Sequence, residues 1–134
     1  MILPLGAIVA VIDGEKLVML KNHGDEREMK LSAMPTVHVE GESAGSGARH
    51  HSSAANPDES QAAEDGFAAG AANLLNRQVL DGAISSLVII AAPRTLGELR
   101  KHYHKALIAV LQHEIAKDLT GHAVRDIEKT LAAA

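Results

Sequence analysis

Two runs of branched apolar residues stand out from the more polar chain around them. They are residues 6–12 (GAIVAVI) and residues 86–91 (SLVIIA). Apolar runs of this length are typical of strands that are covered on both faces, so both are predicted to be central strands. The first run ends at Asp13-Gly14-Glu15-Lys16, and apolar residues return at 17–20. Because Asp and Gly tolerate positive φ, this pair predicts a hairpin turn between the first two strands.

The segment between residues 30 and 80 predicts an edge strand, a loop and a helix. Residues 30–39 alternate loosely between apolar and polar, and Pro35 favours an edge position for this third strand. Residues 41–57 are rich in Gly, Ser, Ala and His, which predicts a flexible loop. Apolar residues then recur at helical spacing, which indicates a helix over 58–80.

The last third of the chain predicts two more helices around an ambiguous segment. Thr95 and Glu98 have capping-box spacing and predict a helix over 96–105. A final amphipathic helix is expected over 121–132, with Thr120 as its cap. Residues 107–115 fit either a helix or a strand, because their apolar positions satisfy both periods.

These elements predict an α/β fold in one domain, residues 1–134. We expect a five-stranded mixed sheet in the order 3-2-1-4-5 with flanking helices, which is the ribonuclease H-like arrangement. With 134 residues, 46% hydrophobic and 22% charged, the composition is that of a single soluble domain. The absence of cysteine excludes disulfides, thiolate zinc sites and thiol nucleophiles.

The location is expected to be cytoplasmic, with no membrane partner. The apolar residues 2–12 contain Pro4 and Gly6 and fall far short of the roughly 20 residues that a spanning helix needs.

Basic side chains gather toward the end of the chain. Residues 1–92 carry 6 basic and 12 acidic side chains, whereas residues 93–134 carry 7 basic and 5 acidic ones. A surface that faces a polyanion is therefore expected in the last third. The candidate contacts for an anion or RNA are Arg94, Arg100, Lys101, Lys105 and Lys117. The same side chains would also suit an ordinary solvated helix face.

A second group of candidates follows the predicted parallel strands, where ligands of such sheets collect. Asp13, Asp118 and His122 form this candidate strand-end cluster, beside Arg94 and Lys117. Arg94 and Lys117 are consistent either with an anion-binding edge or with plain turn and capping chemistry. We expect Asp118 to pair with Arg94 or Arg100 and so to hold the ends of the fourth and fifth strands together.

Motifs for common catalytic chemistry are missing from the chain. Ala92-Pro93-Arg94 stands where a two-metal nuclease needs an acid, and the histidine spacings match no strong metal motif. There is no nucleophile elbow, dinucleotide fingerprint or P-loop lysine. No metal and no cofactor are therefore predicted.

Four stretches resemble one bacterial family. They are residues 87–107 (LVIIAAPRTLGELRKHYHKAL), 114–132 (EIAKDLTGHAVRDIEKTLA), 6–22 (GAIVAVIDGEKLVMLKN) and 67–77 (FAAGAANLLNR). They resemble proteins "required for attachment to host cells", the host attachment proteins. That family is similar to the middle domain of archaeal and eukaryotic peptide-release factors, which implies a ribonuclease H-like fold and a strand within 107–115.

The chain departs from this pattern in two ways. Residues 41–57 are shorter and richer in Gly, Ser and Ala than the Asp-, Arg- and Gly-rich loop of the family. There is also no Gly-Gly-Gln, so peptidyl-tRNA hydrolysis by that tripeptide does not carry over.

Two functions follow as hypotheses. The first is a noncatalytic binding module that contacts the ribosome or tRNA through the five candidate cations, or otherwise a protein partner. The alternative is a hydrolase that uses Asp13, Arg94, Asp118 and His122.

Overall fold

A computed structural model describes residues 1–35, 38–41 and 57–134, so the predicted flexible loop at 41–57 lies almost entirely outside the described residues. One five-stranded sheet organises the chain, in the order β3-β2-β1-β4-β5. This confirms the predicted strand order. The strands are β1 (Ile8–Ile12), β2 (Leu17–Asn22), β3 (Leu31–Ala33), β4 (Leu87–Ala91) and β5 (Leu111–Ala116).

The sheet is mixed, as the sequence predicts. β1 and β2 form an antiparallel hairpin, and β1, β4 and β5 run parallel to one another. The third strand is much shorter than the predicted 30–39: it pairs with β2 over Leu31–Ala33 only. The Met34 N–H still donates to the Met19 carbonyl, and Pro35, which follows Met34, has no N–H to donate.

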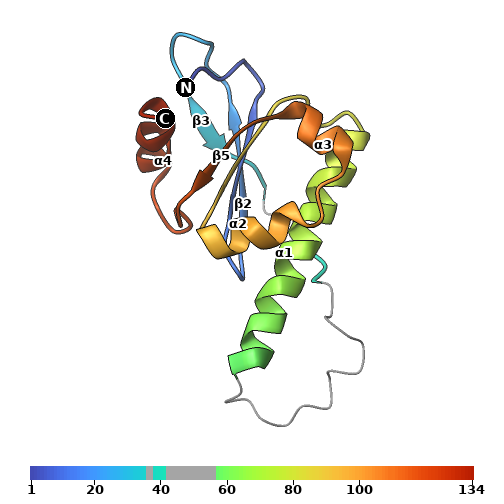
Figure 1. Cartoon of the computed structure of the whole chain (residues 1–134). Helices are drawn as coiled ribbons and strands as arrows, with labels where there is room; N and C mark the ends of the chain where they lie inside the picture. Colours follow the sequence, from blue (N-terminus) through green and yellow to red (C-terminus); the bar gives the residue numbers. More distant parts are fainter. Residues whose placement is uncertain (36–37, 42–56) are drawn as a thin grey trace.

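Helices cover both faces of the sheet (Figure 1). On one face lie α1 (Pro57–Leu80), α2 (Pro93–Arg100) and α3 (Lys105–Val110), and on the other lies α4 (Val124–Ala132). The alternating side chains of β1 and β4 divide into two aliphatic cores, one beneath α1 to α3 and one beneath α4. With five of five residues buried in each, β1 and β4 are the central strands that their apolar runs predict.

The helix predicted over 96–105 is two helices. α2 begins at Pro93, three residues early, because proline suits the first position of a helix. The predicted capping box is wrong: no side chain caps α2, and Thr95 lies inside the helix. After a bend at residues 101–104, α3 runs to Val110 and β5 starts at Leu111. Residues 107–115 are thus helical first and a strand afterwards.

The last helix begins later than predicted, at Val124 rather than residue 121. Its N-cap is Ala123, and no side chain caps it, so the capping role predicted for Thr120 is wrong. Leu119 is 7% exposed and packs in the core beneath α4. Within the described ranges, none of the helices has the length and apolar character needed to cross a bilayer.

Candidate functional site

The ends of three parallel strands bring distant parts of the chain to one edge of the sheet. In the register, Ile12 lies beside Ala91, and Ala91 lies beside Ala116. The residues that follow these three positions therefore emerge at the same edge. We call this the carboxyl edge and define it by Asp13, Arg94, Lys117, Asp118 and Thr120.

Asp13 closes the hairpin between β1 and β2 with its side chain. Its Oδ1 accepts hydrogen bonds from the backbone N–H groups of Glu15 (2.7 Å) and Lys16 (2.6 Å). Neither Asp13 nor Gly14 has a positive φ, so the predicted reason for this turn is wrong although the hairpin is confirmed. The Asp13 carboxylate therefore stabilises this turn through the two backbone N–H groups that it accepts, without a positive φ at either residue.

The hydroxyl of Thr120 lies between two carboxylates. Its Oγ1 is 2.8 Å from Asp13 Oδ2 and 2.7 Å from Asp118 Oδ1. Because a hydroxyl carries one proton, it donates to only one of the two oxygens at a time. The structure thus joins the ends of β1 and β5 through Thr120, a contact that the sequence analysis missed.

Asp118 has a different partner from the one predicted. Its Oδ1 also accepts from the Thr120 N–H at 3.3 Å, and Arg100 is bound to Glu114. Among the described residues Asp118 forms no ion pair with Arg94 or Arg100, so the predicted pair is wrong. An Asp two residues before Thr reaches the near backbone more easily than a distant cation.

The ionisation of Asp13 reflects these contacts. Partial burial acts to raise its pKa. Hydrogen bonds from the Glu15 N–H, the Thr120 hydroxyl and the Lys16 N–H outweigh the burial, and the pKa is lowered from its ordinary value. Asp13 is therefore a stable carboxylate at neutral pH rather than a proton donor.

The five predicted cations divide into two groups. Arg100 pairs with Glu114 at 3.0 Å, and Lys101 pairs with Glu98 at 2.9 Å. The other three are exposed, and no ion pair connects any of them to an acid in the described part of the chain. We call these three the free cations: Arg94, Lys105 and Lys117.

Arg100 belongs to a separate polar cluster around the turn between α2 and α3. Glu114 on β5 accepts from Arg100 Nη2 at 3.0 Å and from the Tyr103 hydroxyl at 2.8 Å. Asn76 on α1 donates to the His102 carbonyl at 2.8 Å and accepts from the His104 N–H at 2.9 Å. We call Asn76, Arg100, Tyr103, His104 and Glu114 the bend cluster.

The bend cluster explains why the predicted helix is interrupted. His104 caps α3, because its Nδ1 accepts from the Ala106 N–H. The Asn76 side chain meanwhile forms hydrogen bonds with the His102 carbonyl and the His104 N–H, which in a continuous helix would bond to other backbone groups of that helix. An Asn in the middle of a helical pattern is a weak helix former, which is the one signal in the sequence that could have indicated this role.

The four residues of the hydrolase hypothesis are only partly brought together. Asp13 and Asp118 meet through Thr120. In the described residues, Arg94 and His122 make no side-chain hydrogen bond or ion pair with either. Across those same ranges, no three His, Asp or Glu side chains are grouped so as to hold a metal ion.

Comparison with known families supplies one match. Residues 6–131 match the sequence profile of the family described as "Bacterial archaeo-eukaryotic release factor family 12". No protein of curated function matches the chain.

Proposed function

This chain belongs to bacterial archaeo-eukaryotic release factor family 12, and from that membership we propose that it is a noncatalytic cytoplasmic binding module of the translation machinery. Its partner in this proposal is ribosomal RNA or tRNA. The observation that carries the proposal is that Arg94, Lys105 and Lys117 are exposed without an acidic partner in the described chain. The similarity to host attachment proteins belongs to the same proposal, since it spans the segments that hold these cations.

A basic side chain without an ion pair can bind a phosphate at lower cost than one that must first leave an acidic partner. Arg100 and Lys101 would have to leave Glu114 and Glu98 before they could bind a phosphate. Arg94, Lys105 and Lys117 need only displace water and counterions, and the release of counterions from RNA favours such contacts. The proposed interface is therefore the three free cations rather than all five.

The chemistry of the carboxyl edge supports binding rather than catalysis. The Asp13 carboxylate is occupied by two backbone N–H groups and by Thr120, and its pKa is lowered. Asp13 is therefore a poor general base: a carboxylate with a lowered pKa is too weakly basic to abstract a proton efficiently at neutral pH. The chain also has no Gly-Gly-Gln with which to hydrolyse peptidyl-tRNA.

Co-sedimentation with bacterial ribosomes across a salt series tests the proposal. We expect binding of the native protein to weaken at least about tenfold between about 50 and 200 mM salt, because phosphate contacts depend steeply on salt. The variant Arg94→Gln/Lys105→Gln/Lys117→Gln should bind weakly even at low salt. The matched control Lys21→Gln/Lys30→Gln/Lys129→Gln changes the charge equally at three exposed lysines that also have no ion pair in the described chain but lie outside the predicted set of anion contacts. It should bind like the native protein, so the pair of variants tests the position of the cations.

Two results would overturn this proposal. Equal loss of binding in both triple variants would show that net charge matters and not the free cations. Binding that persists unchanged at high salt would replace the RNA contact with a protein contact.

A further inference from the structure

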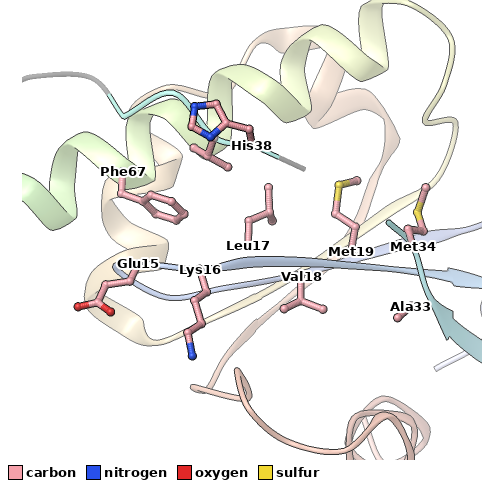
Figure 2. A pocket seen from close by; sticks show the side chains of 10 residues that line it. Glu15, Lys16, Leu17, Val18, Met19, Ala33, Met34, His38 and Phe67 are labelled. Carbon is pink, nitrogen blue, oxygen red and sulfur yellow. The ribbon is translucent and has the colours of Figure 1, made fainter. Parts of the chain in front are cut away.

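Two histidines differ in what their imidazole rings contact. His38 lines a cavity of about 790 Å³ beside β2, on the same side of the strand as Phe67 (Figure 2). Its side chain is 84% exposed, and its Nε2 lies 3.9 Å from the exposed Glu40. His104 instead holds a backbone group, because its Nδ1 accepts from the Ala106 N–H at 2.9 Å. A change in the charge of His104 therefore acts on the backbone, whereas a change at His38 acts on a surface contact.

The short helix α3 depends on His104 at its first turn. The His104 ring accepts from Ala106, and the His104 carbonyl accepts from the N–H groups of Leu107 (2.9 Å) and Ile108 (3.1 Å). α3 has six residues, and a helix this short is marginal unless packing and capping support it. Leu107 supplies the packing in the core beneath α1 to α3, and His104 supplies the cap.

This cap requires one protonation state of the ring. A neutral imidazole has a proton on one nitrogen and a lone pair on the other, so Nδ1 accepts only when the proton is on Nε2. In the imidazolium ion both nitrogens carry protons and neither accepts. The Nδ1–H would then face the Ala106 N–H, and the positive charge would lie at the N-terminal end of a helix, where it is unfavourable. Protonation of His104 and capping of α3 therefore exclude each other.

The acids packed around the bend already have partners. They are Glu98 of α2, with Lys101 and His102, and Glu114 of β5, with Arg100 and Tyr103. Among the described residues, no carboxylate lies within ion-pair distance of the His104 ring. A positive charge on this ring therefore gains no acidic partner that would offset the loss of the cap.

Basic residues are closer to His104 along the chain and along α1 than acidic ones are. Lys105 follows it directly, and Arg77 follows Asn76, whose Oδ1 accepts from the His104 N–H at 2.9 Å. The acids of α1 all lie within residues 58–65, about three helical turns or more before Asn76. The neighbouring charges thus favour the neutral ring that the cap needs.

We propose that His104 is a pH-sensitive cap, and that protonation of its ring releases the Ala106 N–H and opens the first turn of α3. Histidine is the side chain that ordinarily titrates between pH 5 and 8, so this device operates in mildly acidic solution. Asn76 holds the backbone at 102 and 104 through an amide that does not titrate, so the bend stays attached to α1 while the turn of α3 opens. The device concerns the backbone of α3 and does not depend on the proposed RNA contact.

Amide and ring NMR of the full-length protein between pH 7.5 and pH 5.5 tests the proposal. At pH 7.5 the ring nitrogen signals of His104 should place the proton on Nε2. As the pH falls, the Ala106 amide signal should move with the same midpoint as the His104 ring signals. The protection of the Ala106 amide against hydrogen exchange, corrected for the intrinsic effect of pH, should fall about fivefold, the usual effect of losing an N-cap.

The variant His104→Asn separates capping from titration. Its side-chain oxygen caps a helix well and does not titrate, so the protection of Ala106 should stay within about twofold across this pH range. The matched control is His122→Asn, which removes an exposed histidine whose ring forms no hydrogen bond or ion pair in the described chain. This control should keep the fall in Ala106 protection that the native protein shows.

Three results would overturn the proposal. The first is an Ala106 amide whose protection stays constant while the His104 ring titrates. The second is an equal fall in protection for His104→Asn and the native protein, which would make another group the cause. The third is a His104 ring that carries its proton on Nδ1 at pH 7.5. His104→Asn keeps all three free cations, so this proposal and the ribosome assay fail separately.

Discussion

The bend cluster and the carboxyl edge are two polar groups in the same domain, yet they are built differently. In the bend cluster, the Asn76 amide both donates and accepts a hydrogen bond, and the Glu114 carboxylate accepts hydrogen bonds from Arg100 and Tyr103. At the carboxyl edge, two carboxylates share the single hydroxyl of Thr120. The nearby Arg94 and Lys117 have no acidic partner in the described chain.

This difference distinguishes polar side chains that hold the fold together from charged side chains that are available to a binding partner. A network whose donors and acceptors are matched holds elements together, and its loss leaves buried groups unsatisfied. Exposed charges without partners contribute little to stability, and water or a ligand can bind them. Substitutions in the bend cluster should therefore affect unfolding, and those at the carboxyl edge should affect binding.

The largest effect on stability is expected at Asn76. Asn76→Ala removes the donor to the His102 carbonyl and the acceptor for the His104 N–H, so the turn between α2 and α3 loses its attachment to α1. We expect the free energy of unfolding to fall by about 2 kcal/mol, as measured by chemical denaturation.

The neighbouring residue gives the control for this measurement. Arg77→Ala changes an exposed side chain on the same helix turn and should stay within about 0.5 kcal/mol of the native protein. If the two variants were equally stable, the bend cluster would be no more structural than the surface around it.

Tyr103→Phe should have an intermediate effect, a loss of about 1 kcal/mol at neutral pH. Phe keeps the ring but not the hydroxyl that donates to Glu114 at 2.8 Å. Burial, and then the bond to Glu114, raise the pKa of Tyr103 well above its ordinary value. The stabilisation that this raised pKa reflects is present below the unfolded pKa of about 10 and is lost as the pH rises above it.

Denaturation at pH 7 and at about pH 11 measures this difference. The difference in free energy of unfolding between the native protein and Tyr103→Phe should be smaller at the higher pH. If this difference were the same at both pH values, the stabilisation by the Tyr103 hydroxyl would not depend on its being protonated.

The two central strands and the strand order could be predicted from the sequence because burial on both faces leaves a strong apolar signal. The two runs at β1 and β4 are such a signal, and the Asp-Gly pair after β1 marks the hairpin. Right-handed parallel connections then leave few possible orders. The exact helix starts were predicted less well, since Pro93 and Thr95 each carry a valid start signal, and α2 begins at the proline.

The polar contacts could be predicted only in part. Strand order places Asp13, Arg94 and Lys117 at one edge, so their convergence was foreseeable. The partners of Asp118 and Arg100 were not, because long-range side-chain pairs depend on rotamers and distances that periodicity does not contain. Glu114 lies on β5 and Asn76 on α1, and nothing local in the sequence connects either one to residues 100–104.

The smallest effect on stability is expected at the carboxyl edge, which sharpens the comparison most directly. Asp118→Asn keeps an oxygen that can accept from the Thr120 N–H and hydroxyl, and it removes one of two neighbouring negative charges. We expect the free energy of unfolding at pH 7 to change by less than about 0.5 kcal/mol. A loss as large as that of Asn76→Ala would mean that the carboxyl edge is a structural network too.

Acid titration distinguishes Asp13 from Asp118 at this edge. The lowered pKa of Asp13 means that its carboxylate stabilises the fold above the ordinary value of 3.8, and that this contribution is lost as the pH falls through the folded pKa. Thermal melts between about pH 5 and pH 2 should therefore show a shallower fall in stability for Asp13→Asn than for the native protein. Asp118→Asn keeps the backbone donors of Glu15 and Lys16 on Asp13, so its melts should still follow the native acid dependence. If Asp118→Asn flattened the curve as much as Asp13→Asn, the acid-dependent stability of this edge would depend on the Asp118 carboxylate as well as on that of Asp13.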